Sequence, residues 1–170
     1  PTATWQSGST CLISNISNAT AFANTGSGHG QAFSNFIWDC PSQTTTFVLG
    51  APILTLPWAG VFAENFIVKR TGNSTGVLAL TSPASSGNIQ RNFTVGNFYQ
   101  RSGIVIIALN TNNAASPQRS LTVNGIFSVT DSSAAPASSF QILNAPVGVT
   151  NARLFVNGNV DMFTTVTSAT

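Results

Sequence analysis

Residues 121–129 read Leu-Thr-Val-Asn-Gly-Ile-Phe-Ser-Val, and residues 154–160 read Leu-Phe-Val-Asn-Gly-Asn-Val. In both stretches apolar and polar residues mostly alternate along the chain. This alternation is typical of a β-strand that turns one face to the core and the other outward. Similar runs recur along the chain between clusters of Gly, Pro, Ser and Asn, which favour turns.

The pattern therefore predicts an all-β protein. No stretch keeps apolar residues at helical spacing without a Gly or Pro, so we expect no helix of consequence. The expected strands are Cys11–Ile16, Gln31–Trp38, Thr45–Leu49, Ile53–Leu56, Ala63–Arg70, Gly76–Thr81, Ile89–Val95, Ile104–Asn110, Leu121–Thr130, Phe140–Leu143 and Arg153–Phe163.

Many short strands with regular turns predict a single antiparallel β-sandwich of the jelly-roll kind. The expected domain covers residues 1–170. Residues 131–139, rich in Ser and Ala, are expected to form a loop within it or a linker before a C-terminal strand segment. No internal repeat of the length typical of solenoids is recognised in the sequence.

Only 6% of the 170 residues are charged, while 42% are hydrophobic. A typical soluble domain has about 25% charged residues, so the composition disfavours disorder, coiled coils and long surface helices. Hydroxyl and amide side chains, 20 Ser, 21 Thr and 17 Asn, must solvate much of the surface. Low net charge promotes association, which favours packing against other macromolecules.

The charges and apolar runs also limit the partners. The net charge is +2, and the six bases are spread along the chain, so no strong nucleic-acid footprint is predicted. The longest apolar run, Ile104 to Leu109, is far shorter than the roughly 20 residues that cross a bilayer. No membrane insertion is expected.

The two cysteines, Cys11 and Cys40, could form a disulfide that stabilises an extracellular domain by roughly 3–4 kcal/mol. They could equally be two buried thiols. Four N-glycosylation sequons begin at Asn15, Asn18, Asn73 and Asn92. With so many Ser and Thr residues, chance alone gives about four sequons, so they say little about glycosylation.

No constellation for catalysis is found. His29 is the only histidine and lies in a Gly-rich loop, which favours an exposed side chain. The four acids, Asp39, Glu64, Asp131 and Asp161, are dispersed, so neither a glycosidase pair nor a metal cluster is indicated. We expect no enzyme activity, cofactor or metal, and the tryptophans and Tyr99 are expected to be mainly core residues.

Two segments carry a family resemblance. In residues 54–83 an aromatic-x-Gly turn opens a long strand, and the chain then returns through Gly-x-Leu to a Pro. Residues 102–110 followed by 120–131 look like a closing hairpin that ends in an Asp. This pattern resembles picorna-like jelly-roll viral capsid proteins of the plant coat protein type. The resemblance implies a jelly roll that packs against copies of itself in a shell.

The leading hypothesis is therefore a non-enzymatic structural subunit, a viral coat or capsid protein that self-assembles in a virion. The alternative is a secreted or cell-surface adhesion domain that binds glycans. Its expected glycan contacts are His29, Tyr99, Asn110, Asn112 and Asn113. A further variant is a filament or pilus subunit in which a terminal strand pairs with a neighbouring copy.

Overall fold

The computed structural model describes residues 5–18, 32–49, 61–72, 75–81, 92–109, 119–130, 138–144 and 152–162. In these ranges every regular element is a strand, as the sequence predicts. The strands are β1 (Thr10–Ser14), β2 (Phe33–Asp39), β3 (Thr46–Val48), β4 (Ala63–Arg70), β5 (Val77–Thr81), β6 (Asn92–Val95), β7 (Asn97–Gln100), β8 (Ile104–Leu109), β9 (Arg119–Val123), β10 (Phe127–Val129), β11 (Ser139–Asn144), β12 (Ala152–Val156) and β13 (Val160–Met162).

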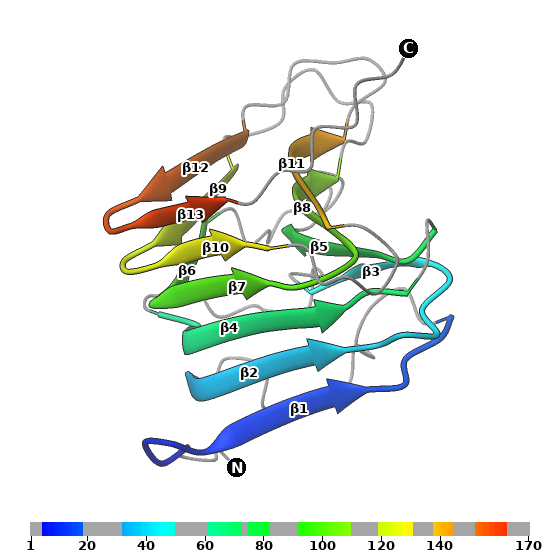
Figure 1. Ribbon diagram of the computed structural model, residues 1–170, viewed down its shortest axis with the longest axis horizontal. Coiled ribbons are helices and arrows are strands. Elements are labelled where there is room, and N and C mark those ends of the chain that lie inside the picture. Colours follow the sequence, from blue (N-terminus) through cyan, green and yellow to red (C-terminus); the bar gives the residue numbers. More distant parts are fainter. Residues whose placement is uncertain are drawn as a thin grey trace, which may run out of the picture.

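The strands form three sheets in which every pair is parallel. Sheet A has the order β1-β2-β4-β7-β10-β13, sheet B has β11-β8-β5-β3, and sheet C has β12-β9-β6. Figure 1 shows the strands of sheet A stacked with their arrows in one direction. The prediction of a single antiparallel β-sandwich, jelly-roll-like or not, is wrong.

The chain visits the sheets in turn. It runs through β4, β5 and β6 in sheets A, B and C, and then through β7, β8 and β9 in the same order. Each circuit adds one strand to each sheet, which is the architecture of a parallel β-helix, a solenoid of stacked rungs. The strands that resemble a capsid protein, β4 with β5 and β8 with β9, lie in different sheets and do not pair.

A repeat underlies these rungs. Of the four Asn-Phe pairs in the sequence, those at residues 35–36, 65–66 and 97–98 lie in register with one another across sheet A, while the pair at 92–93 lies in sheet C. The repeat is about thirty residues long, within the usual range for solenoids. Few residues recur from rung to rung: Asn-Phe-Ile at 35–37 and 65–67 is followed by Asn-Phe-Tyr at 97–99, so the repeat is hard to recognise in the sequence.

Glycines allow the corner between sheets C and A. Gly125 N–H donates to the carbonyl of Gly96 at 2.7 Å, so the two backbones touch. A Cβ on Gly158 would lie 2.4 Å from the carbonyl oxygen of Gly125. The stretch 121–129 is therefore two strands in different sheets, joined at Asn124-Gly125, rather than one strand.

Stacked phenylalanines fill the core behind sheet A. The rings of Phe36, Phe66, Phe98 and Phe127 follow one another with centroids 5.3, 5.7 and 5.4 Å apart and nearly parallel planes. All four side chains are buried. Burying each one contributes about 1.5–3 kcal/mol relative to an exposed ring. The rungs are thus joined both by backbone ladders and by a continuous apolar column.

The C-terminal strands continue the same sheets. β11 pairs with β8, β12 pairs with β9, and β13 pairs with β10. Residues 131–137 of the expected loop lie outside the described residues, as does the expected strand Ile53–Leu56. Among the described residues, no helix is long and apolar enough to cross a membrane.

Candidate functional site

A groove of about 550 Å³ opens at the edge of sheet A where its parallel strands begin. It lies between the segment that precedes β1, the first residues of β2 and β4, and the corner that leads into β7. Its lining residues are Trp5, Ser7, Ala32, Phe33, Ser34, Val61, Glu64, Gly96 and Asn97. The volume is within the range of about 300–1,000 Å³ in which small ligands bind.

A carboxylate and a hydroxyl form the polar part of the groove. Ser34 and Glu64 are neighbours because Phe33 pairs with Ala63 in the parallel register of β2 and β4. Ser34 Oγ donates to Glu64 Oε2 at 2.6 Å and accepts from the N–H of Gly8 at 2.9 Å. Ser34 is buried and Glu64 is exposed, so the carboxylate is oriented from one side and open to a ligand on the other.

The position of this carboxylate follows from the corner between sheets C and A. At this corner, residues of successive rungs lie one above another in the register of the parallel strands. Gly158, Gly125 and Gly96 form such a column, and Glu64 and Ser34 continue it in the next two rungs. A Cβ on Gly96 would lie 2.4 Å from the carbonyl oxygen of Glu64. The groove therefore opens at the rung where the column changes from glycine to residues with side chains.

Aromatic rings form the apolar part. The Trp5 ring lies 5.0 Å from the Phe33 ring, tilted by 54°. Phe33 in turn meets the edge of Phe62, which belongs to the buried core. Trp5 is half-buried, so part of its ring remains accessible. Of the tryptophans expected in the core, Trp38 is buried as predicted, while Trp58 lies outside the described residues.

A ladder of amides runs from the groove across the outer face of sheet A. Asn97 Nδ2 donates to Asn65 Oδ1, and Asn65 Nδ2 donates to Asn35 Oδ1, both at 2.9 Å. Asn97 Oδ1 accepts from the N–H of Ile126 at 2.8 Å. Each amide nitrogen carries two donors, so Asn65 and Asn97 each keep one N–H for a ligand.

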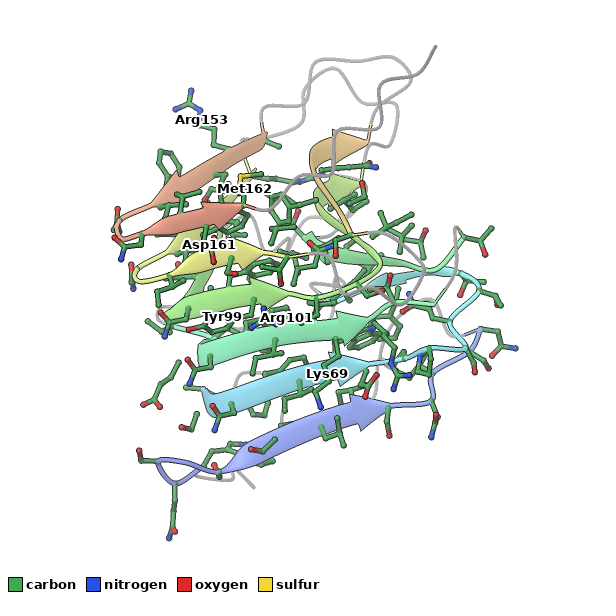
Figure 2. The ribbon with its side chains drawn as sticks, viewed as in Figure 1. Lys69, Tyr99, Arg101, Arg153, Asp161 and Met162 are labelled. Carbon is green, nitrogen blue, oxygen red and sulfur yellow. The ribbon has the colours of Figure 1, made fainter. Side chains whose placement is uncertain are left out.

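Tyr99 lies on the same outer face, two residues after Asn97 of the amide ladder. It is the register partner of Ile67, which pairs with Ile37, and that residue pairs with Leu12 at the edge of the sheet. The guanidinium of Arg101 lies 5.8 Å from the centre of the Tyr99 ring, which favours a cation–π contact. Tyr99, a predicted glycan contact, is half-buried on this outer face (Figure 2).

Three bases lie close together at the opposite edge of sheet A, where its parallel strands end. Lys69 and Arg70 end β4, and Arg101 follows β7. They come together because Arg101 N–H donates to the carbonyl of Val68 at 2.8 Å. Figure 2 shows Lys69 and Arg101 on the same face of the sheet as Tyr99. The sequence spreads the six bases along the chain, whereas the fold groups half of them.

One of these bases has an acidic partner. Arg70 Nε lies 2.6 Å from Asp39 Oδ1. The hydrogen bond from Arg70 lowers the pKa of Asp39 below its ordinary value, and the charge of Lys69 contributes to the same shift. Asp39 thus stays ionised at neutral pH and offsets one of the three positive charges.

The other predicted site residues are scattered or lie outside the description. His29, Asn110, Asn112, Asn113 and the sequon residue Asn73 lie outside the described residues. Of the remaining sequons, Asn15 and Asn18 are exposed after β1, and Asn92 is exposed at the start of β6. Their glycosylation stays a prediction.

The two cysteines carry free thiols in the structure. Cys11 pairs in register with Phe36, four residues before Cys40. Four residues of extended chain span about 13 Å, whereas the Cα atoms of a disulfide lie within about 7 Å. Of the two alternatives left open by the sequence, the register therefore argues against the disulfide and favours two thiols, of which Cys40 is buried and Cys11 half-buried. Burial raises the pKa of both thiols.

Metal-binding groups are sparse in the part of the chain that the structure describes. No cluster of three or more His, Cys, Asp or Glu side chains occurs there. Asp39, Glu64 and Asp161 lie in three different rows of sheet A, and Asp131 lies outside the described residues.

Comparison of the chain with protein-family models, with curated proteins and with solved structures gave no match. The functional argument therefore rests on the geometry of sheet A and its groove. Sequence analysis missed Ser34, Glu64 and Asn97 as site residues. The recurring Asn-Phe pairs could have located them. Ser34 and Glu64 each come directly before such a pair, and Asn97 is the first residue of one.

Proposed function

We propose that the protein is a non-enzymatic binding module displayed on the surface of a virion or a cell, and that its groove binds carbohydrate. The observation that carries this proposal is the composition of the groove. A half-buried tryptophan, an oriented carboxylate and an amide of the ladder line the same groove.

This combination suits the chemistry of sugars. One face of a sugar ring carries C–H groups that pack on an aromatic ring, here that of Trp5, while its hydroxyls need acceptors and donors at the edge. Glu64 supplies a carboxylate acceptor, and Asn97 supplies an N–H donor. Apolar walls with a few oriented polar groups are the usual construction of a ligand site.

The proposal of binding without catalysis is supported by the acids. Most glycosidases need two carboxyl groups, about 5–9.5 Å apart, on opposite sides of the scissile bond. Among the described residues that line the groove, Glu64 is the only acid. A single carboxylate held by a serine can orient a sugar hydroxyl, but it does not supply an acid and a base together.

The test is a glycan array followed by titration of the glycans that bind. Glu64→Gln removes the charge and keeps the shape, so we expect about a ten- to hundred-fold loss of affinity, as for one charged hydrogen bond. Asp161→Asn is the matched control, because Asp161 is exposed on β13, away from the groove. If no glycan binds, or if both variants lose affinity equally, the proposal is wrong.

A second candidate function is self-assembly as a structural subunit, which the C-terminal rung favours. Phe155, Val160 and Met162 are 44%, 58% and 53% exposed on β12 and β13. Edge strands with apolar side chains tend to pair with another chain. Light scattering tests this function: we expect the mass to rise with concentration, and Val160→Lys to abolish the rise. A monomer at all concentrations would exclude it.

A further inference from the structure

We propose that Lys69, Arg70 and Arg101, the basic cluster, form a second subsite that holds a carboxylate or sulfate group of the ligand. The ligand of sheet A would then be an acidic polysaccharide that runs from the groove to the basic cluster. This inference rests on the proposed function and names the class of carbohydrate.

The charge balance of the cluster supports an anionic ligand. All three bases are exposed, and Asp39 offsets only Arg70. Neither Lys69 nor Arg101 forms an ion pair with a described acid. Among the described residues around the cluster, the bases therefore exceed the acids by two. Exposed positive charges that acids do not fully balance attract anions over about 10 Å at 0.1 M salt.

The geometry of Arg101 fits it for this role. Its Nη1 donates to Thr130 Oγ1 at 2.7 Å, and its guanidinium lies near the Tyr99 ring. These two contacts hold the planar group in one orientation and leave other N–H donors open. A guanidinium fixed in this way can donate two parallel hydrogen bonds to a carboxylate or sulfate.

The outer face of sheet A connects the two subsites. Asn97 of the groove and Arg101 of the basic cluster are four residues apart along β7 and its continuation, which is about 13 Å of extended chain, and both face outward because side chains alternate with a period of two. Several sugar rings are needed to span that distance, so a polysaccharide fits and a monosaccharide does not. Between the two ends lie the amide ladder and the row that contains Ile67 and Tyr99. These rows offer hydrogen-bond donors and flat apolar surface along the path.

The same features disfavour a nucleic acid. Proteins that bind single strands stack successive bases on several aromatic rings. Between the groove, which Trp5 and Phe33 line, and the basic cluster, Tyr99 is the only aromatic side chain among the described outward-facing residues of sheet A. At the far end of the path, the Glu64 carboxylate would repel a phosphate, whereas a neutral sugar between acidic ones can bind there.

Three polymers with one backbone test the inference: dextran, carboxymethyl dextran and dextran sulfate. Binding is measured at low ionic strength with the full chain. We expect at least one of the charged polymers to bind about ten-fold more tightly than dextran, and higher salt to remove the difference. The polymer that binds more tightly distinguishes a carboxylate ligand from a sulfate ligand.

Variants locate the effect. Lys69→Gln with Arg101→Gln should abolish the preference for charged dextrans, whereas Arg153→Gln should keep it. Arg153 is a matched control because it is exposed on β12 in sheet C, on another side of the solenoid (Figure 2). Thermal unfolding of all variants verifies that they remain folded.

Three outcomes would overturn the inference. These are equal affinity for the three dextrans, equal loss of the preference in the Arg153 variant, and tighter binding of a single-stranded oligonucleotide than of dextran sulfate. Glu64→Gln separates this inference from the proposed function. If glycan-array binding needs Glu64 but charged dextrans gain nothing, the groove binds sugar and the basic cluster does not take part.

Discussion

Phe66 is the side chain whose removal should damage the solenoid most. It is 0% exposed and lies between the parallel rings of Phe36 and Phe98, with the edge of Phe93 against it. Truncation of a buried phenylalanine to alanine costs about 3–5 kcal/mol. Because Phe66→Ala also interrupts a column that spans several rungs, we expect a loss of about 4–5 kcal/mol. This is a large part of the 5–15 kcal/mol that typically stabilises a domain.

Urea unfolding measures this loss, with the fluorescence of the buried Trp38 as the signal. Phe66→Leu keeps most of the volume and should lose about half as much as alanine. Phe155→Ala is the control, since Phe155 is 44% exposed on β12, and it should cost less than about 1 kcal/mol. A loss below about 2 kcal/mol for Phe66→Ala, or equal losses at both positions, would refute the argument from the stacked column.

Three further predictions concern the corner, the ion pair and the thiols. Gly158→Ala should cost about 1–3 kcal/mol and lower the melting temperature, because its Cβ would meet a backbone carbonyl oxygen at 2.4 Å; an unchanged melting temperature would contradict this. Arg70 lowers the pKa of Asp39, so their pairing stabilises the fold above the unfolded pKa of about 3.9 and is lost as the pH falls through the folded value. Arg70→Gln should therefore raise the pKa of Asp39 in an NMR titration, and an unchanged value would show that the pair does not form in solution. Cys11 is half-buried and Cys40 is buried, so a thiol reagent should modify Cys11 first at pH 8 without prior reduction; no reaction before reduction would indicate a disulfide.

The strands could be predicted from the sequence, but their pairing could not. Alternation of apolar and polar residues indicates a strand with one buried face, and that face looks the same in a sandwich and in a solenoid. The two architectures differ in where the chain goes after each strand. At Asn124-Gly125 and Asn157-Gly158 the chain turns a corner into another sheet, although the alternation continues through both corners.

The internal repeat was hidden by unequal rung lengths. Phe36, Phe66, Phe98 and Phe127 are successive register partners, but the intervals between them are 30, 32 and 29 residues. Insertions of different length between the strands remove any fixed period. Only a residue that must stack on its own kind, such as the Phe of the core or the Asn of the ladder, keeps its place from rung to rung.

The residues of the candidate groove could hardly be predicted from the sequence. The expected glycan contacts, amides and an aromatic ring, stay a prediction. Of the residues predicted for this role, Tyr99 lies on the outer face of sheet A. Glu64 and Asn97 are 33 residues apart, and only the register of parallel strands brings such residues to one groove. A search for local motifs could not find them.

The low charge of the chain has a cause in the fold itself. In a parallel solenoid each side chain lies about 4.8 Å from its register partners in the rungs above and below. Like charges in one column would repel, whereas Asn on Asn or Phe on Phe is stabilising. Among the register pairs of the described strands, the charged pair, Asp39 and Arg70, has opposite signs. Sparse charge therefore no longer argues for assembly with copies of the chain, because stacking of rungs already selects against it. The basic cluster on sheet A is an exception to this selection. Because stacking does not account for its charges, a binding function is the explanation that we propose for them.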